Sequence, residues 1–295
     1  MPSEDTTLAD LRQRIDEIDA RVHDLLMDRT EIAQQIGALK GANTPRMRPG
    51  REAEVLRRLI ARHRGDLPKA LIVRIWREIF AAVTALQGPL AVAVYAPEGT
   101  FGYRNLARDQ YGWRTPITAY RSAAQVLEAV GDGRATVGVL PVPSGDELDP
   151  WWRNLASDGE ATPRIVARLP FAVVEPTGSD TPAALAICLA TAEATGHDRA
   201  YVAVETSKVI SRSHLKQLLS AAGLDALDIQ VAEDVGGRVL HLIEVEGYVP
   251  KSDPRLARLI ALDEGTVTQV WAVGGFAVPL SLEEMSAPGP ERSKP

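Results

Sequence analysis

The sequence predicts a multidomain chain in which an all-α N-terminal bundle precedes an α/β region and a small α+β domain. Residues 8–40 place apolar side chains at alternating steps of three and four, which is the spacing of a long amphipathic helix. After residue 89, apolar runs alternate with helical patterns, as in a parallel α/β sheet. From residue 199 the pattern reads β-α-β-β-α-β. The expected divisions are 1–88, 89–198 and 199–280, with a disordered tail over 281–295.

The segment over 8–40 is expected to form one helix of about 50 Å, at 1.5 Å per residue. At position 29, where the apolar seam of this helix calls for an apolar residue, the sequence has an arginine. A guanidinium in such a seam is costly to desolvate unless an anion meets it. Two interpretations stay open: Arg29 fixes the register of a bundle, or it binds an anion there. The seam consists of Leu8, Leu11, Ile15, Ile18, Val22, Leu25, Ile32, Ile36 and Leu39.

Two shorter helices are predicted to follow, over 51–65 and 68–88. Each has a polar residue on the face that its apolar pattern turns inward: Glu52 in the first and Gln87 in the second. Lys40 lies on the same face of the long helix as the arginine, three turns further on. One polar residue of this kind is more often structural than functional. Four of them in one small bundle favour a binding or catalytic site.

Composition limits the class of partner. The net charge is −6, and residues 1–88 hold 15 Lys and Arg against 13 Asp and Glu, an excess that suits a small anion rather than a nucleic acid. The single Cys188 excludes a disulfide framework, and the five histidines lack metal-ligand spacing, so we expect no metal and no cofactor. The sequence has no signal peptide pattern and no apolar run that would span a bilayer. We therefore expect a soluble cytoplasmic protein without a membrane or nucleic-acid partner.

Several sequence motifs over residues 8–88, taken together with their spacing, resemble those of a known family. The motifs are LxxLRxxIDxID from Leu8, GxxK from Gly37, RPGRE from Arg48, and the helix that contains Gln87. Together they resemble the all-helical chorismate mutase domain that is fused to prephenate dehydratase in bifunctional bacterial enzymes. The site residues that this resemblance implies are Arg12, Arg29, Lys40, Arg51, Glu52, Val83 and Gln87.

The resemblance implies the rearrangement of chorismate to prephenate in the biosynthesis of phenylalanine and tyrosine, without a cofactor. Arg12 and Arg29 would hold the two carboxylates of the substrate. Lys40 and Gln87 would meet the ether oxygen, and Glu52 the ring hydroxyl. Arg29, Lys40 and Gln87 thus take the catalytic roles, and the other residues bind substrate. Two residues depart from the family pattern: Val83 replaces a small hydroxyl residue, and Arg48 replaces an aspartate.

The region over 89–198 resembles the first lobe of a prephenate dehydratase domain through Gly99-Thr100-Phe101 and the strand over 138–142. The departures concern the groups that carry the chemistry. Where the family has Pro-Ile-Glu-Asn-Ser, this chain has Pro-Val-Pro-Ser-Gly from Pro141, and no Thr-Arg-Phe triplet occurs. Residues 146–198 are also too few for the second lobe. We interpret the region as a truncated dehydratase-like segment without dehydratase activity.

The region over 199–280 resembles the ACT regulatory domain through its element order and the phrase Glu-Val-Glu-Gly from Glu244. Effector motifs of that family are not recognisable, since residues 211–214 and 232–234 stand in their places. A dimerisation surface is favoured over a working amino-acid sensor. Three functional hypotheses remain: a chorismate mutase without dehydratase activity, a bifunctional mutase and dehydratase, and a non-enzymatic amino-acid-responsive regulator or binding protein.

The spacing of two arginines predicts an assembly. Arg12 precedes Arg29 by seventeen residues, which on one straight helix separates them by about 25 Å and about 100°. They cannot clamp one small molecule from a single chain. The resemblance implies a homodimer with intertwined, antiparallel long helices, in which Arg12 of one chain completes the site of the other.

Overall fold

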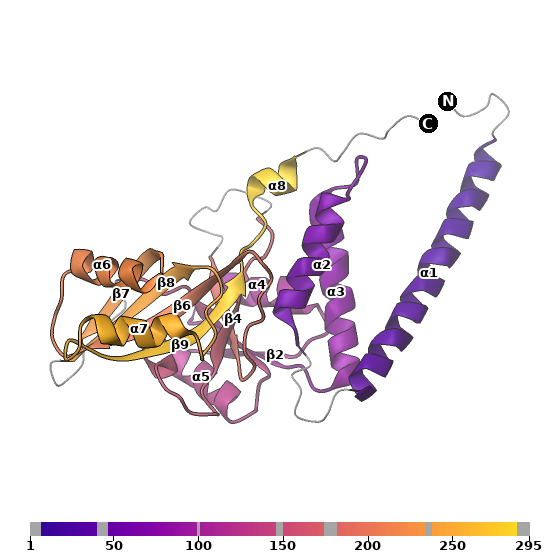
Figure 1. The fold of residues 1–295 in the computed structure, drawn as a ribbon. Coiled ribbons are helices and arrows are strands. Elements are labelled where there is room, and N and C mark those ends of the chain that lie inside the picture. Colours follow the sequence, from indigo (N-terminus) through magenta and orange to yellow (C-terminus); the bar gives the residue numbers. More distant parts are fainter. Residues whose placement is uncertain are drawn as a thin grey trace.

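The computed structural model describes residues 7–39, 47–98, 101–145, 150–173, 182–233 and 238–287. Three helices form the N-terminal part, and one mixed sheet with helices on its faces forms the remainder. Figure 1 shows α2 and α3 between α1 and the sheet. It also shows that α1 meets α3 near one end and diverges from it toward the N-terminus. The three helices are α1 (Leu8–Leu39), α2 (Pro49–Ala61) and α3 (Lys69–Gln87).

The predicted helices of the N-terminal part are confirmed. Thr7 caps α1, since its Oγ1 accepts from the backbone N–H of Asp10 at 3.2 Å while the Asp10 carboxylate accepts from the Thr7 N–H at 2.9 Å. The second helix begins two residues earlier than expected because Pro49 fits the first turn, where its missing N–H costs no hydrogen bond. It also ends earlier, at Ala61.

Within one chain, α1 buries none of its residues. Its apolar seam is open to solvent along most of its length: Ile18 is 54% exposed and Leu25 is 64% exposed. A contiguous apolar stripe of this length is unusual on the surface of a monomeric protein. The seam is therefore an apolar surface that nothing in the described part of the chain covers.

Helices α2 and α3, in contrast, share a hydrophobic core with the C-terminal part of the chain. Helix α2 contributes Leu56 and α3 contributes Phe80, and both pack in the same cluster as Phe171, Leu280 and Met285. Leu56 is completely buried. These two helices are thus held by the body of the protein, whereas α1 is not.

One nine-stranded sheet runs through the rest of the chain in the order β2-β1-β3-β5-β4-β9-β6-β8-β7. Strands β1, β2 and β3 are parallel, and β5 joins them antiparallel to β3. The link between the two halves is a parallel pairing of β4 with β9 at Ile165 and Gly274. A side chain at Gly274 would collide with the backbone of Ile165, so this junction requires glycine. The strands are β1 (Val92–Tyr95), β2 (Ile117–Tyr120), β3 (Val137–Pro141), β4 (Arg164–Leu169), β5 (Ala184–Cys188), β6 (Asp198–Thr206), β7 (Ala226–Glu233), β8 (Val239–Glu246) and β9 (Val267–Ala277).

The C-terminal part has the predicted order β6-α6-β7-β8-α7-β9. Its helices α6 (Arg212–Ala222) and α7 (Pro254–Leu262) pack in one core with the sheet. The opposite face of the sheet packs against α5 (Ala123–Gly131) and the short 3-10 helix η1 (Trp151–Leu155). Helix α4 (Gly102–Tyr111) contacts α3 and therefore lies between the sheet and the N-terminal helices.

Within 146–198, where we predicted no particular element, η1, β4 and β5 form, and their apolar residues contribute to the main core. One expectation needs correction. The tail expected to be disordered from residue 281 begins with a helix, α8 (Leu282–Ser286). Ser281 and Glu284 form a reciprocal capping box, and Met285 is buried against the core shared by α2 and α3.

Among the described helices, none is long and apolar enough to cross a membrane. The described residues also contain no cluster of three or more His, Cys, Asp or Glu side chains that would hold a metal ion.

His241 on β8 provides a pH test of this fold. Its side chain is buried, and its Nε2 lies 3.1 Å from Oγ1 of Thr206, whose hydroxyl donates to the carbonyl of Lys208. Nε2–H therefore donates to Thr206, and Nδ1 has no partner among the described residues. Burial lowers the pKa of His241 to about 4.

We expect the free energy of unfolding to fall by about 3 kcal/mol between pH 7 and pH 4 because of this residue. The unfolded chain binds a proton at His241 near pH 6.5, whereas the folded chain resists protonation until about pH 4. Urea unfolding at pH 7 and pH 4.5 measures the effect. His241→Gln should flatten the pH dependence, and His197→Gln, at an exposed position, should not. Equal pH dependence in the wild type and His241→Gln would contradict this account.

Candidate active site

A cavity of about 370 Å³ lies among the three N-terminal helices. Its lining contains four arginines and one glutamate, so positive charge is in excess. The cavity brings together five of the seven predicted site residues, whereas Arg12 is not among its lining and Lys40 lies outside the described residues. The lining residues are Arg29, Ile36, Arg48, Arg51, Glu52, Val55, Arg58, Phe80, Val83, Thr84 and Gln87.

Arg29 brings a cationic group to the cavity, with one buried nitrogen and no matching anion among the described residues. Its Nη1 is buried and has no hydrogen-bond partner among the described residues. The guanidinium carbon lies 5.8 Å from the ring centroid of Phe80 on α3, which is a cation–π distance. Burial lowers the pKa of Arg29, yet a guanidinium remains protonated in proteins. An unpartnered, desolvated donor of this kind is a site that an anion would fill.

Glu52 reaches the cavity from the first turn of α2. One of its oxygens accepts from Nη1 of Arg77 on α3 at 2.6 Å. Burial raises the pKa of Glu52, and the positive charge of Arg77 opposes that rise. The carboxyl group is therefore held in one orientation between the cavity and the interior.

Gln87 fastens α3 to α1. Its Nε2 donates to the carbonyl of Ala33 at 2.9 Å. Gly37 permits this approach, because a Cβ at that position would lie 3.0 Å from Cγ of Gln87. The Gly-x-x-Lys motif thus has a packing role at its glycine, and the amide of Gln87 has a second N–H that this bond does not use.

Two of the cavity arginines are already engaged in ion pairs. Nε of Arg48 lies 2.9 Å from the carboxylate of Glu193, and Nη1 of Arg51 lies 2.8 Å from that of Glu54. All four side chains are 40% exposed or more, so these pairs contribute little stability. An incoming carboxylate can compete for either arginine.

Sequence reasoning missed two residues of this region. Thr84 lines the cavity next to Val83 and supplies a hydroxyl one residue beyond the position where the family pattern has one. Arg77 is 4% exposed and pairs with Glu52, although it lies off the apolar stripe used to orient α3. The available signal was the spacing of Arg77, Phe80 and Thr84, which marks a second inward face on the same helix.

A cavity of about 560 Å³ lies at the carboxyl ends of β1 and β3, where ligands bind in open α/β sheets. Pro141, Val142 and Ser144 line it, so the residues that depart from the dehydratase pattern face this space. Its described lining has one charged residue, Arg121, which pairs with Glu98 at 2.7 Å. No carboxylate is among the described residues that line this cavity.

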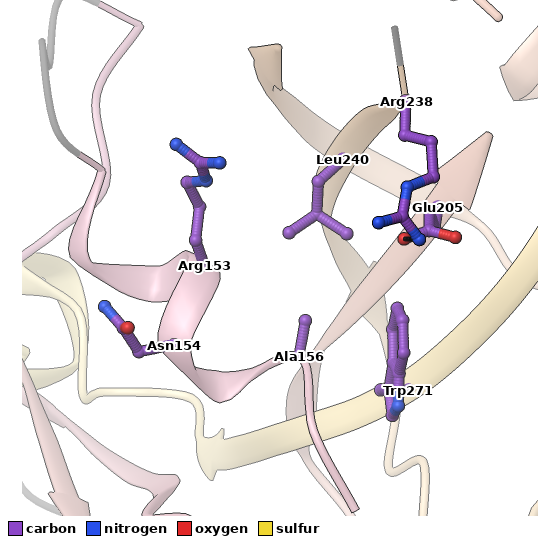
Figure 2. A pocket seen from close by; sticks show the side chains of 7 residues that line it. All are labelled: Arg153, Asn154, Ala156, Glu205, Arg238, Leu240 and Trp271. Atoms are coloured by element: carbon purple, nitrogen blue, oxygen red, sulfur yellow. Dashed lines mark hydrogen bonds and ion pairs between the residues drawn. The ribbon is translucent and has the colours of Figure 1, made fainter. Parts of the chain in front are cut away.

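Another cavity, of about 320 Å³, lies between η1 and the sheet (Figure 2). Arg153 projects from η1 on one side, while Arg238 and Glu205 lie together on the other. Arg238 and Glu205 form an ion pair at 3.4 Å, and Glu205 also accepts from the hydroxyl of Thr268 at 2.6 Å. One of the two arginines of this lining is thus neutralised by a glutamate. The cavity among the N-terminal helices has a larger excess of arginines and suits an anion better.

Comparison with known families identifies the helical part. Residues 11–88 match the family model of chorismate mutase type II. The N-terminal helices therefore form a chorismate mutase type II domain. This agrees with the resemblance drawn from the sequence motifs.

Curated relatives match about half of this chain. The bifunctional chorismate mutase/prephenate dehydratase of Stutzerimonas stutzeri is 34% identical over 151 residues, which are 49% of this chain and 41% of that protein. The protein of the same description from Aquifex aeolicus is 33% identical over 140 residues, 46% of this chain and 38% of its own. The chain thus covers about two fifths of the length of these relatives.

Two solved structures are similar at low identity. The prephenate dehydratase of Streptococcus mutans is 15% identical with a TM-score of 0.47, and the match covers 65% of this chain and 100% of that one. GqqA, described as a quorum-quenching acylase, is 18% identical with a TM-score of 0.46 and coverages of 67% and 98%.

Proposed function

We propose that this protein is a chorismate mutase and that the cavity among α1, α2 and α3 converts chorismate to prephenate. The observation that carries the proposal is the buried, unpartnered Nη1 of Arg29 in a cavity lined by an excess of arginines. Chorismate is a dianion, and both of its charges are carboxylates, which guanidinium groups bind well. The family match of residues 11–88 supports the same activity.

The proposed reaction is an intramolecular rearrangement in which one carbon–oxygen bond breaks and one carbon–carbon bond forms. It needs no covalent intermediate and no proton transfer. A protein accelerates such a step by holding the folded conformer of the substrate and by placing donors where the ether oxygen gains negative charge. The lining of the cavity offers several cationic groups for such a task.

The residue roles are those that the resemblance implies, and the described lining of the cavity supports them for Arg29, Glu52 and Gln87. Arg29 would bind a carboxylate, and Gln87, with Lys40, would donate to the ether oxygen. Glu52 would accept from the ring hydroxyl, since its remaining exposed surface lies toward the cavity. Arg51 would bind substrate beside it, and Val83 would contact the ring.

The proposal includes a homodimer. One chain leaves the seam of α1 uncovered, and Arg12, near the N-terminal end of α1, is not among the residues that line the cavity. A second copy packed antiparallel would cover the seam and bring its own Arg12 to the cavity. The partner that best fits the surface is thus another α1, because it presents a complementary apolar stripe.

We further propose that the α/β region has no dehydratase activity. Loss of water from prephenate calls for groups that assist departure of the hydroxyl and the carboxylate. The described lining of the cavity beyond β1 and β3 offers Arg121 but no acid that would protonate the leaving hydroxyl. Of the two activities named for the bifunctional relatives, we therefore propose only the chorismate mutase activity for this chain.

Arg29→Ala and Lys40→Ala should each lower kcat/KM for chorismate by about 100- to 1000-fold, because each removes a preorganised charged donor. Arg74→Ala, at an exposed position on α3, serves as the matched control and should remain near wild type. Circular dichroism and thermal unfolding establish that the variants are folded. A folded Arg29→Ala protein with nearly full kcat/KM would rule out the assignment.

Prephenate should not be converted to phenylpyruvate at a rate above the uncatalysed background. The measurement follows phenylpyruvate with purified protein and prephenate, and the same preparation is assayed with chorismate to establish that it is active. Phenylpyruvate that forms in proportion to the amount of protein would contradict the prediction. Phenylalanine and tyrosine should be tested as additives, so that an effector requirement does not hide the activity.

Mixing the inactive variants Arg12→Ala and Arg29→Ala through unfolding and refolding should restore activity. With random pairing, half of the dimers are mixed, and each mixed dimer has one site with both arginines, so about a quarter of all sites recover. Wild-type protein taken through the same procedure measures the refolding yield. A mixture that stays as inactive as its components, beside well-refolded wild type, would show that Arg12 does not act across the dimer.

A further inference from the structure

We infer that Arg77 is a positioning residue for the mutase site and that the α/β region holds Glu52 in place through it. The inference rests on the proposed function of the helical cavity. It assigns the dehydratase-like region a task in the mutase reaction, as the back wall of the site. We use this term for Phe171, Gln110 and Tyr111, which lie behind Arg77 and Glu52.

Arg77 lies behind Glu52 as seen from the cavity. Glu52 belongs to the cavity lining, whereas Arg77 does not and instead faces a small gap between α2 and the sheet. Their ion pair, at 2.6 Å, joins side chains that are 5% exposed for Arg77 and 16% exposed for Glu52. Arg77 would therefore not touch the substrate, and any effect of it on the reaction must pass through Glu52.

The α/β region fixes Arg77 from the other side. The guanidinium carbon of Arg77 lies 5.3 Å from the ring centroid of Phe171, which follows β4 in the chain. Arg57 of α2 lies 5.9 Å from the centroid of the same ring and donates to the carbonyl of Val278 at 2.7 Å. Phe171 is thus held between two arginines of the mutase domain, and it is itself buried.

Helix α4 completes the back wall. Gln110 lines the gap beside Arg77, and Tyr111 lines a second small gap together with Glu52. The hydroxyl of Tyr111 is buried without a partner among the described residues. Burial raises the pKa of Tyr111, so this wall stays neutral at ordinary pH.

The charge of Glu52 depends on this arrangement. The described charged and titratable groups around it are Arg77 from α3, Tyr111 from α4 and the four arginines that line the same cavity, Arg29, Arg48, Arg51 and Arg58. Arg77 is the one bonded to it, whereas Arg51 pairs with Glu54. Loss of Arg77 would leave a buried carboxyl without its main partner, which favours the protonated form and releases its orientation.

A double-mutant cycle on kcat/KM for chorismate tests the inference in the full-length protein. We expect Arg77→Met to lower kcat/KM by about tenfold or more and Arg77→Lys to recover part of that loss, because a lysine keeps the charge. In the Glu52→Gln background, Arg77→Met should lower kcat/KM by less than about twofold. The double variant leaves no buried charge unpaired, so it can fold where Arg77→Met alone does not.

The pH profile gives a readout that a purely structural role would not move. Ionisation of Glu52 should give a pH-dependent rise in kcat/KM that is absent in Glu52→Gln. In Arg77→Met this rise should occur at higher pH than in wild type. Phe171→Leu should also lower kcat/KM, by less than Arg77→Met does. This decrease should be absent in the Glu52→Gln background.

Independent losses that multiply in the double variant, or an unmoved pH profile in a folded Arg77→Met protein, would overturn the inference while leaving the mutase assignment intact. A wild-type protein that does not convert chorismate would overturn both the assignment and the inference.

Discussion

The apolar seam of α1 is exposed to water within one chain, and this exposure is costly for an apolar stripe. A helix of 32 residues buries none of them within one chain, although it carries an apolar residue at nearly every inward position of its repeat. The seam is interrupted by Arg29, whose buried Nη1 has no partner among the described residues. Hydrophobic burial and charge neutralisation therefore remain incomplete at the same place. We propose that a second copy of α1 buries the seam and that a dianionic substrate neutralises Arg29.

The opposite side of the site is complete. Helices α2 and α3 share one core with residues that follow β4 and β9, and the buried pair of Glu52 and Arg77 lies where the helices meet this body. The cavity thus lies between a buried, paired back and the exposed seam of α1, which we propose a second copy covers. Under the proposed function, this arrangement gives the α/β region a task in the mutase reaction, because we infer that it orients the carboxylate of Glu52 through Arg77.

Apolar periodicity predicted the elements whose buried face shows in their own sequence. The helices of the N-terminal part and the order of the C-terminal elements followed from apolar spacing, and Arg29, Glu52 and Gln87 were found because they break that spacing. Arg77 was missed because its partner wall comes from residues far along the chain, which gives α3 a second buried face. Strands β4 and β5 were missed because short apolar runs do not reveal which strands they pair with. Helix α8 was missed because its composition masked a capping box.

Molar mass in solution distinguishes the proposed dimer from a monomer, since one chain leaves the seam of α1 exposed and does not bring Arg12 to the cavity. Light scattering on the active protein should give twice the 31.9 kDa of one chain. Ile18→Asp, which places a charge in the seam, should reduce the mass to that of one chain and abolish conversion of chorismate. Val209→Asp, at an apolar position exposed elsewhere, should change neither. A wild-type monomer that converts chorismate would contradict the account.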